Sequence, residues 1–122
     1  MLKKVFICED EPAIAKLIKL RLNADGFKDI TLFDKGEKLC EHIKNEMPDL
    51  LLLDVMIPGI DGMTILKTLK GDDGSKHVKV IMLTALSKEA DIVKCLDMGA
   101  DDYITKPFSP AELSSRVKKI LR

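Results

Sequence analysis

Strand-like and helix-like patterns alternate five times along the chain, and this alternation limits the possible folds more than any other feature. The apolar runs that predict strands cover residues 3–8, 29–33, 50–53, 78–83 and 101–105. Strands that alternate with helices are typical of βαβ units, which build a parallel sheet. The run at 50–53 consists only of leucine, as expected for a central strand that is buried on both faces.

Residues that favour helix ends mark where the helices between these strands begin and stop. Pro12 suits the first position of a helix over 12–24, and Gly26 suits its end. A second helix is expected over about 35–46. The predicted caps of the later helices are, in chain order, Asp34 with Glu37 as an acidic capping box, Asp61, Ser87, and Ser109 with Glu112 as a full capping box.

The rules that govern how strands and helices are connected reduce the number of possible folds further. Right-handed crossovers with helices on both faces of a sheet leave few topologies. We therefore expect a doubly wound (βα)5 sandwich of three layers, which is a flavodoxin-like α/β fold with a five-stranded parallel sheet in the order 2-1-3-4-5. The chain has 122 residues, of which 46% are apolar, and this suits a single domain over 1–122 with a buried core.

Polar side chains follow four of the predicted strands, at the point where each strand ends. Glu9 and Asp10 follow the first strand, Asp54 follows the third, Thr84 the fourth and Lys106 the fifth. The ends of parallel strands share one edge of the sheet, and ligands bind outside that edge. In the order 2-1-3-4-5 the first and third strands are neighbours. We therefore expect the three carboxylates to converge on one small volume.

Three carboxylates in one pocket repel each other and stay ionised only if a cation compensates them or a pKa rises. The donor set contains oxygen only, with no histidine or cysteine nearby, which favours Mg²⁺ over Ca²⁺. We expect Asp10 and Asp54 to bind the metal ion directly and the longer Glu9 to reach it through water. A backbone carbonyl in the turn after Asp54, that of Met56, is expected to add a further oxygen.

A carboxylate beside Mg²⁺ can attack a phosphoryl group and form an aspartyl phosphate. Phosphoryl transfer depends on positioning and charge neutralisation more than on covalent help from the protein. Lys106 offers a compact positive charge for the phosphate oxygens, and Thr84 offers a hydroxyl donor. The small side chain of Ala85 leaves the approach open.

In these residues the chain resembles the receiver domain of two-component response regulators. The resemblance covers essentially all 122 residues. It rests on Glu9-Asp10-Glu11, Asp54 with Pro58-Gly59 and Asp61-Gly62, Met82-Leu83-Thr84-Ala85, Gly99-Ala100-Asp101-Asp102-Tyr103, and Lys106-Pro107-Phe108. The roles that it implies are Asp54 as phosphoacceptor, Glu9 and Asp10 as metal-binding acids, Thr84 as switch hydroxyl, Lys106 as phosphate lysine and Tyr103 as switch aromatic.

The resemblance also implies a mechanism and partners. A sensor histidine kinase or a phosphotransfer protein is the expected phosphodonor, and Mg²⁺ is the expected cofactor, with Mn²⁺ as a substitute. Phosphorylation draws Thr84 toward the phosphate, Tyr103 moves inward, and the surface of the fourth helix, fifth strand and fifth helix changes partners. The chain is then a switch and not an enzyme, apart from self-phosphorylation and slow self-dephosphorylation. Apolar Met56 and Leu86 occupy two positions that affect dephosphorylation in the family, which predicts a long-lived phosphoryl group.

The segment from Gly99 to Arg122 resembles receivers that are joined to winged-helix DNA-binding domains. A homodimer formed on phosphorylation is then expected, and the implied interface residues are Asp102, Glu112 and Arg116. That class usually carries a basic residue after the acid of the fourth helix, but here Asp91 is followed by Ile92, so Glu112 is expected to lack its partner. We expect either a receiver excised from its C-terminal DNA-binding domain or, alternatively, a single-domain regulator that acts by protein–protein contact.

Composition and sequence patterns argue against several other classes of protein. Lysine plus arginine and aspartate plus glutamate number 20 each, so the formal net charge is zero. This balance argues against direct binding of nucleic acid or an anionic membrane by bulk charge. No apolar stretch approaches the roughly 20 residues that a membrane span needs, and the apolar run near the start is too short for a signal peptide. The cysteines show no CxxC spacing, so neither a zinc site nor a disulfide is indicated, and a cytoplasmic location is expected.

Three other functions are compatible with parts of the pattern. An aspartyl-nucleophile phosphatase needs a second acid two residues after the nucleophile, where this chain has Met56. A flavin-binding protein uses the same sheet edge, but here that edge is acidic and would repel a phosphate. A phosphate-independent interaction module would not need the complete set of acids, hydroxyl and lysine.

Overall fold

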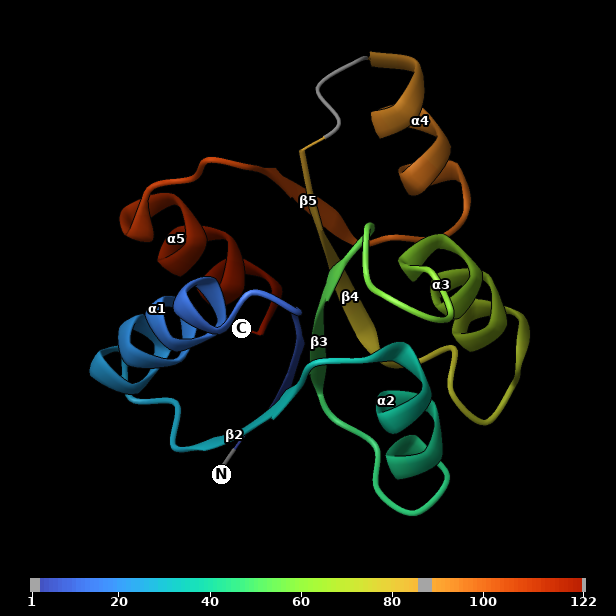
Figure 1. Cartoon of the computed structure of the whole chain (residues 1–122), viewed down its shortest axis with the longest axis horizontal. Helices are drawn as coiled ribbons and strands as arrows, with labels where there is room; N and C mark the ends of the chain where they lie inside the picture. Colours follow the sequence, from blue (N-terminus) through green and yellow to red (C-terminus); the bar gives the residue numbers. More distant parts are fainter. Residues whose placement is uncertain (1–2, 86–88, 122) are drawn as a thin grey trace.

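Five parallel strands form one sheet in the order β2-β1-β3-β4-β5 in this computed structural model, as predicted (Figure 1). The structure describes residues 3–85 and 89–121. Leu86 and Ser87, which the sequence analysis singled out, lie outside the described residues. The elements are β1 (Lys4–Cys8), α1 (Pro12–Ala24), β2 (Asp29–Phe33), α2 (Gly36–Ile43), β3 (Leu50–Asp54), α3 (Gly62–Gly71), β4 (Lys79–Thr84), α4 (Glu89–Asp97), β5 (Asp102–Thr105) and α5 (Pro110–Ile120).

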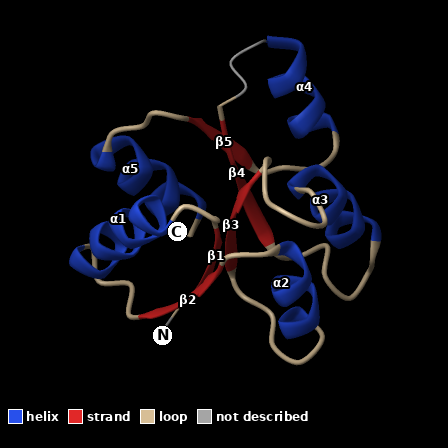
Figure 2. Ribbon diagram, viewed as in Figure 1, coloured by secondary structure: helices blue, strands red, loops and turns tan. Residues whose placement is uncertain are grey.

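The helices cover both faces of the sheet, with α1 and α5 on one face and α2, α3 and α4 on the other (Figure 2). Strand side chains alternate between the faces and divide the core into two apolar layers. Leu51 and Leu53 pack toward the layer that includes α2 and α3, whereas Leu50 and Leu52 pack toward the layer that includes α1 and α5. Every residue of β3 is buried, as expected for a central strand.

Two of the predicted helix caps are present. The Asp61 carboxylate accepts a hydrogen bond from the backbone N–H of Thr64 at 2.9 Å and caps α3. The Ser109 hydroxyl accepts the N–H of Glu112 at 3.1 Å and caps α5. These short-range pairs form because both partners belong to the same helix end.

The predicted capping box of α2 is wrong. The residue at the N-cap is Lys35, and no side chain caps this helix end. Asp34 lies one position too early and forms an ion pair with Lys38 at 3.0 Å, while the Glu37 carboxylate leaves the helix to accept a distant backbone N–H. The helix is also shorter than expected: it ends at Ile43, whereas the sequence predicted an end near residue 46.

The three cysteines are free thiols. Cys8 and Cys95 are buried in the apolar layer beside α2, α3 and α4, and Cys40 packs against it. Burial raises the pKa of the Cys8 thiol to about 12, so it is protonated and unreactive at neutral pH. Among the described residues, no helix is long and apolar enough to cross a membrane.

A polar cluster joins the end of α1 to α5. The Ser114 hydroxyl, buried on α5, donates a hydrogen bond to the Asp25 carboxylate and accepts one from Arg21 Nε at 3.2 Å. Lys118 Nζ lies 3.5 Å from the other oxygen of the same carboxylate. The Ser114 hydrogen bond, with Lys118 and Arg21, lowers the pKa of Asp25.

Replacing Ser114 with alanine is expected to destabilise the protein by about 1–2 kcal/mol at neutral pH. A carboxyl whose pKa is lowered by folding stabilises the protein above its unfolded pKa, about 3.9 for aspartate, and this contribution is lost as pH falls through the folded pKa. The difference between wild type and Ser114→Ala should therefore shrink in acid. Urea unfolding at neutral and at acidic pH measures this, with exposed Ser115→Ala as control. A difference that does not change with pH would contradict the assignment.

Candidate functional site

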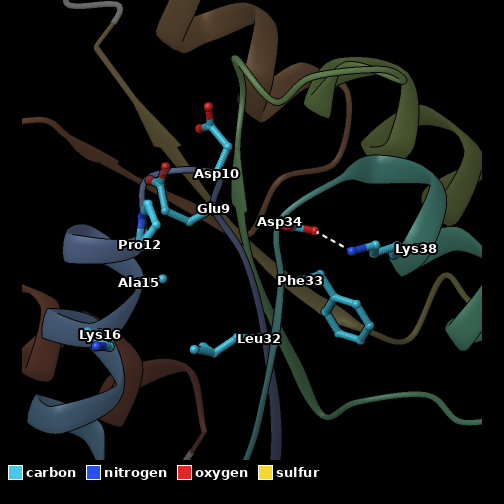
Figure 3. Close-up of a pocket in the computed structure, with 9 residues that line it drawn as sticks. All are labelled: Glu9, Asp10, Pro12, Ala15, Lys16, Leu32, Phe33, Asp34 and Lys38. Atoms are coloured by element: carbon cyan, nitrogen blue, oxygen red, sulfur yellow. Dashed lines mark ion pairs between the residues drawn. The ribbon is translucent and has the colours of Figure 1, made fainter.

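The predicted site residues meet at the edge of the sheet where the strands end. Cys8 lies beside Leu53 in the pairing of β1 with β3, so the residues that follow each strand emerge together. The structure brings Glu9, Asp10 and Asp54 so close that a carboxylate oxygen from each lies within 4.8 Å of the others. Glu9 and Asp54 are buried, and Asp10 is partly exposed. Figure 3 shows Glu9 and Asp10 directly after β1.

Lys106 compensates two of these acids. Its Nζ lies 2.6 Å from Glu9 Oε1 and 2.8 Å from Asp54 Oδ2. Burial alone would lower the pKa of Lys106, but the hydrogen bonds to Asp54 and Glu9 outweigh it and the pKa is raised. Burial raises the pKa of Glu9 to about 7, although the hydrogen bond from Lys106 opposes this. Sequence analysis assigned Lys106 to a phosphate and did not foresee that it pairs with both acids.

Two donors orient the Asp54 carboxylate. The backbone N–H of Met56 donates to Oδ1 at 3.0 Å, while Lys106 donates to Oδ2 at 2.8 Å. Each oxygen therefore has a different partner, and the plane of the carboxylate is held by the turn that follows β3. Met56 as a residue is 70% exposed, and its contact with the carboxylate is made by the backbone N–H.

The arrangement of these residues fits a hard divalent cation. All donors from Glu9, Asp10 and Asp54 are carboxylate oxygens, which are the ligands that such cations prefer. When all three carboxylates are ionised, the cluster with its one lysine carries an excess of two negative charges, which a divalent ion would balance. A cavity of about 380 Å³ lies next to Glu9 and Asp10 and is lined further by residues of α1 and β2 (Figure 3).

Thr84 and Tyr103 lie on the neighbouring strands. Thr84 is buried at the end of β4, and its carbonyl accepts the backbone N–H of Lys106 at 2.7 Å. Tyr103 pairs with Met82 across β4 and β5, and Met82 precedes Thr84 by two residues. Alternation along a strand therefore directs Tyr103 and Thr84 to the same face of the sheet, where Tyr103 packs half-buried against the core.

Of the three residues expected at an interface, Arg116 contacts each of the other two within this chain. Arg116 Nη1 donates to both oxygens of Asp102, at 2.9 and 3.0 Å. Arg116 also lies 3.6 Å from the Glu112 carboxylate, and its guanidinium carbon lies 5.8 Å from the centre of the Tyr103 ring. Glu112 therefore has a partner inside the chain. Arg116 therefore links both acids to the ring of Tyr103.

Comparison with known proteins identifies the family to which this chain belongs. The family model described as the response regulator receiver domain matches residues 5–118. This chain belongs to that family, which confirms the resemblance and the fold predicted from the sequence.

Named relatives include transcriptional regulators. The chain is 43% identical to the alkaline phosphatase synthesis transcriptional regulatory protein PhoP of Bacillus subtilis, and 39% identical to the phosphate regulon transcriptional regulatory protein PhoB of Escherichia coli. Both matches cover 100% of this chain, but 50% and 53% of those proteins. The chain thus spans about half the length of these curated relatives. The BeF3-activated receiver domain of Klebsiella pneumoniae RstA is similar in structure, with a TM-score of 0.87, 37% identity and 98% coverage of both chains.

Proposed function

We propose that this receiver domain, which spans residues 1–122, accepts a phosphoryl group on Asp54. The observation that carries this proposal is the buried Asp54 carboxylate, oriented by Lys106 and by the Met56 N–H beside two further acids. The phosphodonor is a histidine kinase or a phosphotransfer protein. An oxygen of Asp54 forms a bond to phosphorus while the bond from phosphorus to the donor breaks, and the donor keeps the electron pair.

The side chains around Asp54 have separate roles in this transfer. Glu9, Asp10 and Asp54 hold Mg²⁺, or Mn²⁺ in its place, together with the backbone carbonyl of Met56. When bound, the ion neutralises charge on the phosphoryl oxygens. Lys106 exchanges its contact with Asp54 for one with the phosphoryl group, since it already lies 2.8 Å from that carboxylate. The Thr84 hydroxyl donates a hydrogen bond to the same group.

The phosphorylated domain then acts as a switch in a cytoplasmic regulator. Movement of Thr84 lets Tyr103 turn inward, and Tyr103 lies against Arg116, whose pairs with Asp102 and Glu112 form part of the α4-β5-α5 surface. We propose that this surface forms a homodimer and controls a DNA-binding domain elsewhere in the protein, because the named relatives are transcriptional regulators. In the alternative, a single-domain regulator, the same surface binds another protein.

Intact mass after treatment with acetyl phosphate and Mg²⁺ tests the proposal. Wild type is expected to gain one phosphoryl group, and Asp54→Ala to gain none, because the attacking oxygen is lost. Asp73→Ala removes an almost fully exposed aspartate outside the site and is expected to match wild type. Chelation of Mg²⁺ should prevent the gain. Phosphorylation of Asp54→Ala, or none in wild type, would contradict the proposal.

The same sample tests two further points. Sizing at once after phosphorylation distinguishes a dimer from a monomer that binds other proteins. Following the mass after the donor is removed gives the lifetime of the phosphoryl group. We expect a long lifetime because the apolar Met56 side chain cannot orient a water molecule; a half-life of seconds would show that this expectation is wrong.

A further inference from the structure

The loop after Asp54, residues 55–61, is called the acceptor loop here because it carries the Met56 backbone that orients Asp54. Its first half is held by the sheet and by α3. The Val55 N–H donates to the Leu83 carbonyl at 2.9 Å, and the Gly62 N–H donates back to the Val55 carbonyl at 3.0 Å. These bonds secure the start of the loop but do not reach its tip, residues 58–60.

The tip of the acceptor loop is held by α2. Glu37, in the first turn of α2, accepts the backbone N–H of Ile60 at 2.9 Å. The two residues are 23 positions apart in the chain, so this contact joins the first turn of α2 to the loop between β3 and α3.

Two glycines allow this close approach. A Cβ atom at Gly59, which has a φ of +84°, would lie 1.8 Å from Glu37 Oε1, so the carboxylate occupies the space of the absent side chain. A Cβ atom at Gly36 would lie 2.5 Å from the Ile60 carbonyl oxygen. The first turn of α2 and the loop tip are therefore packed backbone against backbone, with the Glu37 carboxylate between them.

Glu37 has no competing ion pair among the described residues. The neighbouring Lys38 pairs with Asp34 instead, at 3.0 Å. The Glu37 carboxylate is exposed, yet its hydrogen bond is to the loop tip and not to a basic side chain or to its own helix end. Its effect is on the acceptor loop, not on the cap of α2.

We propose that Glu37 is a positioning residue for phosphoryl transfer, which holds the acceptor loop so that the Met56 backbone stays aligned with Asp54. This inference rests on the proposed role of Asp54. A displacement of about 1 Å in a reacting group can reduce a rate by about a hundredfold, so even a small loop movement is measurable. Glu37 does not touch the phosphoryl group; it acts through the loop.

The test compares Glu37→Ala with Glu37→Gln, because the amide oxygen of glutamine can still accept the Ile60 N–H. In the metal-free protein, we expect the Ile60 amide to exchange with solvent about tenfold faster in Glu37→Ala and near the wild-type rate in Glu37→Gln. Affinity for Mg²⁺, measured by titration, and the rate of phosphorylation by acetyl phosphate should each fall about three- to tenfold in Glu37→Ala only. Glu41→Ala, an exposed glutamate on the same helix, is the matched control.

The outcomes separate this inference from the proposed function. Wild-type amide exchange, Mg²⁺ affinity and phosphorylation rate in Glu37→Ala would overturn the positioning role while leaving Asp54 as the acceptor. Equal defects in Glu37→Gln and Glu37→Ala would also overturn it, because the charge rather than this hydrogen bond would then matter. Failure of wild type to be phosphorylated would instead remove the proposed function, whereas the amide exchange would still report on the contact with the loop.

Discussion

Replacing Lys106 with alanine is expected to destabilise the metal-free protein by about 2–4 kcal/mol. The Lys106 side chain is 16% exposed and neutralises two almost fully buried carboxylates, at 2.6 and 2.8 Å. Its removal leaves Glu9 and Asp54 buried and facing each other without a counter-charge, and breaking a buried ion pair in this way costs several kcal/mol. Urea unfolding without Mg²⁺ measures the loss.

Addition of Mg²⁺ should recover part of the stability of Lys106→Ala, because a divalent cation replaces the lost positive charge. Phosphorylation by acetyl phosphate should fall by about a hundredfold even at saturating Mg²⁺, since one charge that stabilises the transferring group is gone. Lys76→Ala removes an exposed lysine that pairs with Asp73 and should change the stability by less than about 0.5 kcal/mol. An equal loss of stability in the two variants, or no gain in the stability of Lys106→Ala on addition of Mg²⁺, would argue against this role of Lys106.

Replacing Gly62 with alanine is expected to destabilise the protein by about 1–3 kcal/mol and to impair Asp54. A Cβ atom at Gly62 would lie 2.3 Å from the Asp54 carbonyl oxygen and 2.9 Å from Val55 Cα, both of which are backbone atoms that a side-chain rotation cannot move. Either the start of α3 or the backbone of Asp54 must shift. We expect acetyl phosphate to phosphorylate the variant at least tenfold more slowly.

Gly71→Ala is the matched control for Gly62→Ala. Both glycines belong to α3, but a Cβ atom at Gly71 would meet nothing within 4 Å. Alanine favours a helix over glycine by about 1 kcal/mol, so this variant should be as stable as wild type or more so. The thermal unfolding temperature and the phosphorylation rate of the two variants distinguish the effect of the steric clash at Gly62 from the effect of helix propensity. A Gly62→Ala protein that resembles Gly71→Ala in both measurements would contradict the prediction.

The main elements of the fold and the members of the site could be predicted because their signals are local. Apolar runs that end in acids predicted where β1 and β3 stop, and the order of the sheet brought Glu9, Asp10 and Asp54 together as expected. Caps such as Asp61 were also predictable, because the donor lies three residues away in the same helix.

Most of the contacts that sequence reasoning missed join residues that are far apart in the chain; the ion pair of Asp34 with Lys38 is a local exception. Asp34 and Glu37 have the spacing of a capping box, but the fold places the Ile60 N–H, 23 residues further on, within reach of Glu37. Similarly, the Ser114 hydroxyl finds Asp25 across 89 residues. A signal for Glu37 existed in the glycines at 36 and 59, which permit close backbone approach, but their partners were not evident from spacing.

The sequence by itself determined the alternation of strands and helices, the sheet order that follows from it, and the identity of the acids, hydroxyl and lysine at the strand ends. Only the tertiary structure decided which atoms these residues contact: Lys106 reaches Glu9 across 97 residues and Asp54 across 52. The reason is physical. Periodicity and capping depend on neighbours along the chain, whereas a charged group takes the partner that the packed fold brings within hydrogen-bond distance.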